Sequence, residues 1–546
     1  MDDCEKRRTV TTGETFRPQA MVPEMDYAHA RLSLVLEGDC PLCGRRTSVE
    51  LVGFSPGETV PCHHCSASLN PDCDEVKRLG RDLVMASMDR LEDRLGPWPE
   101  FTHVRKGTIS NFDCHSVLLA YLEDVEVGVE DQNELSLIMH MTAALKPWLL
   151  VRFGAVQSAF FGHLTINVED YLCEREVGVT PSDTFDVFCY DQMVSNLYLK
   201  KKWDALLTTS QGATLLSTYL PRESPHASVR FLFNHNGNDA HQTWHRSRIH
   251  LTFTDAEHDR ARLELERMGI PEDAEYVCMG ERSALYRKQV YADDSRMQNF
   301  TSRDSDFDQY ALAAEALAGR GYYVLRMGAL VDRELKNSHP AIIDYAGKHR
   351  SEFMDIYLGA TCRFFVTPPS GVSSVASICR RPIVFTDYSY LSLLHHWMHN
   401  IIFLPPHLYR AKTGKRLCLA EYCLLRRPSF SLEQFGVSCE PNSREEVLQA
   451  CLEMDDRLSG RWNEAPEDAE LQARFKEQLE RYACGLKGLN DGWLWAEGAS
   501  FLASAGTAFL RENPDFLAEP DRNLRPSFVR NRDAGRCVGE TVPPKR

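Results

Sequence analysis

The sequence lacks a long apolar segment, and it also lacks a signal-peptide pattern at its start. Its longest apolar candidates, near residues 363–379 and 501–510, are too short or are interrupted by proline, serine and glycine, whereas a membrane-spanning helix needs about 20 mainly apolar residues. The first ten residues, MDDCEKRRTV, contain no apolar stretch of the kind that a signal peptide carries. We therefore expect a soluble cytoplasmic protein with no transmembrane segment.

An excess of positive charge is lacking as well. Asp and Glu total 78 against 62 Lys and Arg, which gives a net charge of −16, and the densest basic run, residues 200–202, is short. Such a chain repels a phosphate backbone, so we expect no nucleic-acid partner. The sequence has no internal repeat or low-complexity tract, and its 43% hydrophobic content over 546 residues predicts several globular domains with a substantial core.

The chain contains 18 cysteines, too few for a disulfide scaffold of this length, but four of them form two CxxC pairs. Cys40 and Cys43 form the first pair, and Cys62 and Cys65 form the second. The spacing is that of a zinc ribbon in which four thiolates surround a structural zinc ion. The alternative is a set of free thiols, with His63, His64 or Cys73 nearby as chance neighbours. A closed Cys4 sphere leaves no position for substrate, so the ribbon is expected to serve folding, protein docking or self-association.

From about residue 147 onward, short apolar runs alternate with amphipathic stretches. This alternation predicts an α/β fold with two Rossmann-like domains, a small N-terminal zinc ribbon and a helical C-terminal tail. Thr254 and Glu257 form a capping-box pattern at the start of a helix over 255–268. The expected segments are a flexible N-terminus (1–30), a zinc-ribbon-like module (31–75), a helical connector (76–145), two Rossmann-like domains (146–270 and 271–430) and a helical tail with a frayed end (431–546).

Ligands of parallel α/β sheets bind at the carboxyl ends of the strands, so the residues after each predicted strand are candidates. Glu281 and Arg282 follow the strand expected over 275–279, and Arg326 and Gly328 end the strand expected over 322–327. The guanidinium of an arginine can donate a bidentate pair of hydrogen bonds to phosphate oxygens. For Arg326 the alternative is a salt bridge to Asp344 or Asp355.

The most site-like loop is TPPSGVSS, residues 367–374. Its glycine, its serine hydroxyls and the helix that begins there predict an anion-binding cradle; the alternative is an ordinary capped turn. The loop residues proposed for this cradle are Ser370, Gly371, Ser373 and Ser374.

Three further residues are candidates of lower specificity. His163 follows the strand over 147–154 and could act as a base, or it could simply be a core histidine. Asp355 is expected to face inward and to pair with Arg282 or Arg326 or touch the ligand. Arg303 precedes Asp304-Ser305-Asp306, a D-x-D pattern whose position at a helix start favours capping over metal binding.

Several stretches of the sequence, which contain these candidate residues, together resemble a bacterial family of glycosyltransferases associated with surface-carbohydrate clusters. That family is distantly similar to the fucosyltransferase-like branch of the GT-B fold. The resemblance spans about residues 146–430 and leaves the ribbon outside. It rests on FGHLTINVEDYL (161–172), SNLYLKKKW (195–203), YVCMGERSALY (276–286), the stretch 302–328, SEFMDIYLGATCRFFVTPPSGVSSVA (351–376) and RPIVFTD (381–387).

The resemblance implies a nucleotide-diphosphate sugar as donor and a glycan or glycoconjugate as acceptor. It implies that the domain over 271–430 binds the donor, with Arg282 and Arg326 on the diphosphate and the 370–374 loop around it. The domain over 146–270 would bind the acceptor, and His163 would face the cleft. The chain departs from the family at Gly280, where a histidine is usual, and at His407, in place of a lysine-like position.

These residues predict a metal-independent transfer in which His163, or secondly Glu281, takes the proton of the acceptor hydroxyl. Two alternatives have the same two-domain scaffold. One is a nucleotide-sugar epimerase or hydrolase. The other is a non-catalytic protein that binds sugar nucleotides and docks partners through the ribbon.

Overall fold

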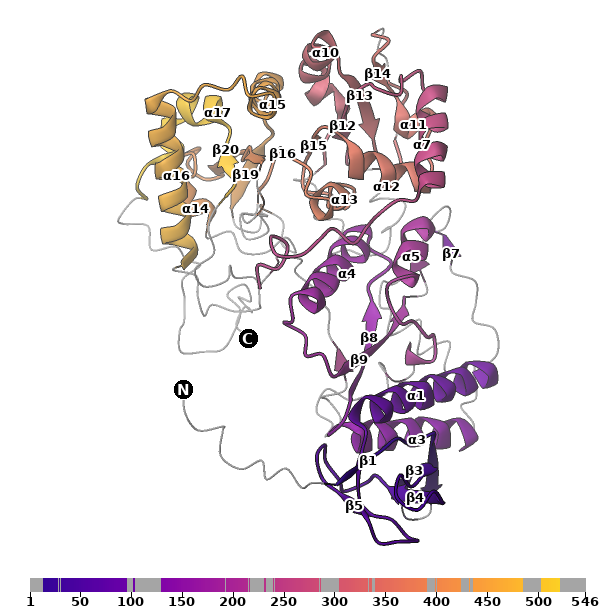
Figure 1. Cartoon of the computed structure of the whole chain (residues 1–546). Helices are drawn as coiled ribbons and strands as arrows, with labels where there is room; N and C mark the ends of the chain where they lie inside the picture. Colours follow the sequence, from indigo (N-terminus) through magenta and orange to yellow (C-terminus); the bar gives the residue numbers. More distant parts are fainter. Residues whose placement is uncertain are drawn as a thin grey trace, which may run out of the picture. The chain divides into compact units, whose positions relative to one another are not determined.

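The computed structural model forms two compact units, each described by itself (Figure 1). The first comprises residues 1–106 and 111–235, and the second comprises residues 107–110 and 236–546. The structure describes residues 13–95, 102–103, 129–216, 230–231, 239–283, 285, 304–335, 339–389, 398, 400–423, 432, 436–484 and 502–520, apart from positions 28, 30, 192, 215, 240 and 332. Within these residues, no helix is both long and apolar enough to cross a membrane.

The first unit begins with a β-module made of two three-stranded sheets. One is antiparallel and has the order β2 (Ala20–Asp26), β3 (Arg31–Asp39), β4 (Arg46–Glu50). The other has the order β1 (Glu14–Phe16), β6 (Ser68–Pro71), β5 (Val60–Pro61), with β1 parallel to β6.

Strands β1 and β2 lie within the segment 1–30, for which the sequence predicts flexibility. The structure differs because β2 pairs with β3 along its whole length and Phe16 of β1 is completely buried. Pro23 lies inside β2, an edge strand, where a missing N–H is tolerated. That proline breaks the strand pattern in the sequence and explains why the pattern is missed.

The core of the β-module continues into two helices, α1 (Cys73–Leu95) and α3 (Val129–Leu145). One continuous cluster of buried residues includes Leu34 of β3, Met88 of α1 and Ile138 of α3. Trp148, which is 1% exposed, donates from its Nε1 to the carbonyl oxygen of Phe54 at 3.1 Å. The ribbon and the connector helices predicted as separate segments therefore share one core.

The rest of the first unit is a parallel α/β layer. Its sheet has the order β11 (Arg230–Phe231), β8 (Leu150–Val156), β9 (Thr184–Tyr190). Helix α4 (Phe161–Glu176) follows β8, and α5 (Leu197–Asp204) follows β9. A short parallel pair joins β10 (Met193–Val194) and β7 (Thr102–His103).

The second unit is built on a seven-stranded sheet, parallel throughout, with the order β14-β13-β12-β15-β16-β17-β20. Its strands are β12 (Tyr276–Gly280), β13 (Tyr323–Met327), β14 (Ile342–Ile343), β15 (Phe365–Thr367), β16 (Ile383–Phe385), β17 (Ile401–Phe403) and β20 (Ser504–Ala505). Numbered along the chain this order is 3-2-1-4-5-6-7, which is the doubly wound Rossmann order with one added strand. The predicted α/β class and parallel sheet are confirmed.

Helices cover this sheet. The helices among the described residues of this unit are α7 (Asp255–Arg267), η3 (Phe307–Tyr310), α10 (Ala311–Gly319), α11 (Tyr345–Lys348), α12 (Glu352–Thr361), α13 (Ser373–Ile378), α14 (Leu419–Tyr422), α15 (Arg444–Leu458), α16 (Pro466–Cys484), α17 (Thr507–Glu512) and η6 (Pro514–Leu517). Figure 1 shows α10 on one side of β12 and β13, and α11, α12 and α7 on the other. The predicted capping box of α7 is confirmed.

Two features of the second unit differ from the sequence-based segments. Helix α7 belongs here rather than with residues 146–270, because Arg260 stacks on the ring of Phe353 in α12. The tail from 431 is more than helical, because it supplies β20 to the sheet and β19 (Val437–Glu440) to a hairpin with β18 (His407–Arg410).

Candidate active site

The strand order creates a topological switch point at the carboxyl ends of the strands in the second unit. From β12 the chain moves to β13 on one side, whereas from β15 it moves to β16 on the other, although β12 and β15 are neighbours. A parallel sheet binds ligands at such a switch point, because the loops after the two strands diverge there. The two loops in question begin at Glu281 and at Pro368. Sequence reasoning selected both.

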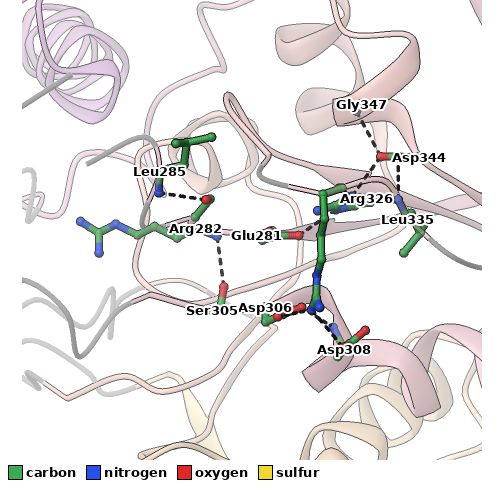
Figure 2. Close-up of polar contacts among 12 residues, drawn as sticks. Glu281, Arg282, Leu285, Ser305, Asp306, Asp308, Arg326, Leu335, Asp344 and Gly347 are labelled. Carbon is green, nitrogen blue, oxygen red and sulfur yellow. Dashed lines mark hydrogen bonds and ion pairs between the residues drawn. The ribbon is translucent and has the colours of Figure 1, made fainter. Parts of the chain in front are cut away.

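Arg282 is held at this edge by its backbone and by one carboxylate. Its N–H donates to Ser305 Oγ and its carbonyl accepts from the Ser305 N–H, both at 3.1 Å. Its Nη1 lies 3.1 Å from Asp304 Oδ1, and its side chain is 18% exposed. In Figure 2 the side chain points away from Glu281 and Arg326. A guanidinium carries five N–H donors in a fixed fork, a geometry that matches phosphate oxygens.

Arg326 has a different environment from Arg282. Its side chain is 1% exposed, and its Nε donates to Glu281 Oε2 at 2.7 Å. Its Nη1 donates to the carbonyl of Arg333 at 2.9 Å and lies 3.4 Å from Asp344 Oδ1 (Figure 2). The salt bridge to Asp344 considered in the sequence analysis is therefore present. These partners explain the buried arginine without an anion, and its role on the diphosphate stays an untested prediction.

Two further candidate residues, Glu281 and Gly328, lie at the carboxyl ends of β12 and β13. The Glu281 side chain is 3% exposed and is bonded to Arg326, which makes it a poor acceptor for a substrate proton. Gly328 follows β13, and a Cβ added to it would lie 3.4 Å from the Glu281 carbonyl oxygen. Both residues thus line the carboxyl end of β12 and β13 and support the backbone that carries Arg282.

The predicted cradle follows β15 and leads into α13. Thr367 Oγ1 lies 3.1 Å from Ser370 Oγ, and Ser373 Oγ donates to the Ser370 carbonyl at 2.7 Å. Val372, the N-cap of α13, provides no side-chain hydrogen bond to the first helical turn. The members of the cradle are half-buried (Ser370, Gly371) or buried (Ser373, Ser374). The loop thus has local turn bonds, as the alternative reading expects, and the Ser374 N–H donates to the Gly371 carbonyl at 3.1 Å. Its role as an anion cradle stays a prediction.

Gly280 is the point at which the chain departs from the family pattern, and its environment leaves no room for a side chain. A Cβ there would lie 2.7 Å from Thr367 Oγ1 and 3.0 Å from Phe365 Cε1, both on neighbouring strand β15. Thr367 is fully buried. The glycine therefore lets β12 and β15 approach each other at the switch point.

We predict that Gly280→Ala lowers the free energy of unfolding by about 1–3 kcal/mol, because overpacking at a buried strand forces its neighbours to move. Thermal or denaturant unfolding would measure this. Gly319→Ala is the matched control, since nothing lies within 4 Å of a Cβ at Gly319 in α10. A Gly280→Ala chain as stable as the control would contradict the packing argument.

Both carboxylates of the D-x-D pattern, Asp304 and Asp306, make structural contacts. Asp306 caps η3 by accepting from the Asp308 N–H at 3.0 Å, and it also pairs with Arg333. Asp304 pairs with Arg282. The capping role expected for Asp306 is confirmed, and both carboxylates of the pattern are engaged by arginines.

Three remaining predicted residues lie in different surroundings. Asp355 is 5% exposed and pairs with Arg350 at 2.7 Å and with the Tyr345 hydroxyl at 2.9 Å, and burial raises its pKa to about 6. The partner is Arg350 and not Arg282 or Arg326, so the expected pairing with a candidate phosphate ligand is not found. Arg303 lies outside the described residues. His163 lies in the first turn of α4 in the first unit, where its ring meets Phe160 edge to face.

Sequence reasoning missed one buried group at the carboxyl end of β16. Asp387 is 3% exposed and accepts from Gln309 Nε2 and from the Asn442 N–H, each at 2.6 Å. Asn442 Oδ1 in turn accepts from the Asp387 N–H at 2.8 Å. Burial raises the pKa of Asp387 to about 6, although the hydrogen bonds from Asn442 and Gln309 oppose the rise. No local sequence signal marks it, because its partners are far along the chain.

The raised pKa of Asp387 predicts a pH dependence of stability. Between about pH 4 and pH 6 the folded chain keeps a proton that the unfolded chain has released, so this group's contribution falls as pH rises through that window and is constant above it. Across this pH window the free energy of unfolding is expected to fall by on the order of 2–3 kcal/mol because of this group. Asp387→Asn should remove it, and asparagine tolerates the positive φ of 50° at this position. Urea unfolding from pH 4 to 7 would measure the difference, and Asp259→Asn, at a carboxylate that is 74% exposed, should leave the wild-type slope unchanged.

The first unit holds the second predicted site. The thiols of Cys40, Cys43, Cys62 and Cys65 all lie within 4.8 Å of one another. Cys40 and Cys62 are buried, whereas Cys65 is exposed. The predicted cysteine cluster is therefore present in a geometry that can hold a metal ion. It lies in the β-module, far in sequence from the candidate site residues of the second unit.

No protein-family model matches this sequence, and no curated protein matches it. Among solved structures, the chain is similar to the E. coli ADP-heptose LPS heptosyltransferase II, at 13% identity and a TM-score of 0.29, over 46% of this chain and 90% of the other. A glycosyltransferase family 9 protein of Veillonella parvula matches at 11% identity and a TM-score of 0.30, over 47% and 86%. The iron-containing dodecameric glycosyltransferase TibC of enterotoxigenic E. coli matches at 11% and 0.27, over 54% and 68%. None of these three is described as fucosyltransferase-like, so that part of the resemblance stays a prediction.

Proposed function

We propose that this chain is a glycosyltransferase that moves a sugar from a nucleotide-diphosphate donor to a carbohydrate or glycoconjugate acceptor. One observation carries the proposal. The 3-2-1-4-5-6-7 sheet brings the Arg282 loop after β12 and the Ser370–Ser374 loop after β15 to the same switch point. An arginine and an N–H-rich loop on adjacent strand ends suit a diphosphate.

The chemistry of transfer requires that the leaving diphosphate be stabilised as negative charge develops on it. Arg282 supplies a forked cation, and the start of α13 supplies N–H groups beside the hydroxyls of Ser370 and Ser373. We propose that these groups do this without a metal ion. The carboxylates of Asp304 and Asp306 support this, since arginines already engage them.

The acceptor hydroxyl must lose its proton to a base during transfer. We propose His163 for this role ahead of Glu281, because Glu281 is buried and bonded to Arg326. Glu281 and Arg326 then act as positioning residues that hold the ends of β12 and β13. Replacement of His163 by asparagine should lower kcat while leaving the affinity for the donor unchanged.

The experiment that tests the proposal is a thermal-shift screen of the full chain with GDP, UDP, TDP and ADP, and with CMP as a monophosphate control. A ligand that binds only the folded state stabilises it by RT ln(1 + [L]/Kd), about 2.7 kcal/mol at a hundredfold excess over Kd. We expect one nucleoside diphosphate to raise the Tm. If none does, the proposed donor site is incorrect. Product analysis with the matching nucleotide sugar then separates transfer, which needs an acceptor, from epimerisation or hydrolysis.

A further inference from the structure

The cysteine cluster of the first unit takes no part in the proposed transfer, and its backbone is built as two equivalent turns. In the first turn the Gly44 N–H donates to the Cys40 carbonyl at 2.9 Å, and the Cys40 N–H donates to the Arg45 carbonyl at 2.9 Å. In the second turn Ser66 donates to Cys62 and Cys62 to Ala67, both at 2.8 Å. The residue after each CxxC is left-handed, with φ of 66° at Gly44 and 57° at Ser66.

A left-handed serine is unfavourable for the isolated backbone, so the second turn needs a compensating interaction. Two copies of one turn, found at two unrelated places in the chain, aim four thiols at a common point. Turns of this kind bring both sulfurs of a CxxC pair onto one side of the backbone, and two of them close a tetrahedron.

Two of the six sulfur–sulfur separations match the edge of such a tetrahedron, and all six lie within 4.8 Å. Cys40 Sγ and Cys65 Sγ are 3.8 Å apart, and Cys43 Sγ and Cys62 Sγ are 3.9 Å apart. Four sulfurs at the usual Zn–S distance of about 2.3 Å would be separated by about 3.8 Å along each tetrahedral edge. The separations are too long for a disulfide bond, which joins sulfurs at about 2.0 Å.

The nearby residues that could replace a cysteine are engaged elsewhere or lie outside the cluster. His64 Nε2 lies 2.9 Å from the carbonyl oxygen of Arg46, and the His64 N–H donates to Cys62 Sγ at 3.4 Å. Cys73 begins α1 and does not belong to the group of four. The donor set is therefore four sulfurs, which favours zinc or iron among the common metals.

The position of the cluster shows what the ion would do. The first turn joins β3 to β4 in one sheet, and the second joins β5 to β6 in the other. Cys40 and Cys62 also belong to the buried cluster that continues through Phe16 and Val76 into α1 and α3. An ion at this point connects the ends of two hairpins whose sheets share that core.

We propose that Cys40, Cys43, Cys62 and Cys65 bind one zinc ion as a closed structural site. This ion holds the two sheets of the β-module together and thereby stabilises the core of the first unit. The proposal is independent of the sugar-nucleotide site, because its residues all lie in the other unit. It gives the ribbon an internal structural role, whereas protein docking through it stays a prediction.

Metal analysis of the purified full chain is the first test. We expect one zinc per chain in the wild type and in Cys73→Ser, and loss of zinc in Cys43→Ser and in Cys65→Ser. Cobalt substitution should give the intense visible bands of a tetrahedral tetrathiolate centre. Iron in place of zinc, no metal, or zinc retained in both ligand variants would overturn the assignment.

Because a ligand variant can fail to fold, a second test removes zinc from the wild-type chain with a chelator and follows amide hydrogen exchange. We expect faster exchange in β3 to β6 and α1, with unchanged exchange in β12 to β17. Nucleotide binding measured on the same sample reports on the second unit, so failure of one proposal is distinguishable from failure of the other. Unchanged exchange in β3 to β6 after zinc removal would overturn the structural role.

Discussion

Replacement of Arg326 by alanine is expected to lower the free energy of unfolding by about 3–5 kcal/mol, because it leaves buried carboxylates without their cation. Glu281 and Asp344, whose side chains are 3% and 4% exposed, would both face an unfilled space. Asp344 also accepts from the N–H groups of Leu335 and Gly347, each at 3.1 Å. Loss of the arginine would therefore loosen the ends of β12, β13 and β14 together. Denaturant unfolding measures the effect.

A matched control for Arg326 lies close by in the same unit. Arg333 is 53% exposed and pairs with Asp306 and Asp308, which are 55% and 60% exposed. Exposed pairs contribute about 0–1 kcal/mol, so Arg333→Ala should change stability little. Adding Glu281→Gln to Arg326→Ala should restore part of the loss, since it removes one unpaired charge. If Arg326→Ala instead keeps its Tm and loses nucleotide binding, Arg326 is a phosphate ligand and the buried-pair argument fails.

Replacement of Arg282 by alanine is expected to weaken nucleoside-diphosphate binding about 10- to 100-fold. Charge-assisted hydrogen bonds of this kind contribute about 1.5–3 kcal/mol. The ligand-free Tm should change little, because Arg282 and its partner Asp304 are both partly exposed, at 18% and 20%. Arg282→Lys should be intermediate, since lysine keeps the charge and loses the fork. Titration calorimetry with the nucleotide selected by the thermal-shift screen measures the change.

The control for Arg282 is an arginine at the amino ends of the strands of the same sheet. Arg363 precedes β15 and pairs with Glu275, which precedes β12, at 3.1 Å. Both residues lie at the amino ends of strands whose carboxyl ends carry the candidate site. Arg363→Ala should leave nucleotide affinity unchanged, and an equal loss in both variants would mean that the site is misplaced.

Much of the local structure was predictable because its causes lie within a few residues. Short apolar runs predicted β8, β12 and β13 to within a few residues. Thr254 and Glu257 predicted the start of α7. The two CxxC pairs predicted a four-thiol cluster, since each pair needs only its own turn to aim both sulfurs.

Other features could not be predicted because they depend on partners distant in sequence. Arg326 bonds to Glu281, and Asp387 bonds to Asn442. Strand β20 consists of Ser504 and Ala505 alone and becomes a strand by pairing with β17. Such contacts have no local periodicity, and the free energy that decides them is gained only when the sheet is assembled.

The sequence by itself determined the α/β class, the positions of β12 and β13, the start of α7 and the four-thiol cluster, since periodicity, capping and CxxC spacing act over short distances. Only the tertiary structure decided the strand order and therefore which loops meet. It separated Arg282, which is placed at the switch point, from Arg326, whose buried partners Glu281 and Asp344 explain it without a ligand. The physical reason is that burial decides the partner of a charge: a desolvated guanidinium needs a carboxylate, and only the folded sheet determines which charges are desolvated.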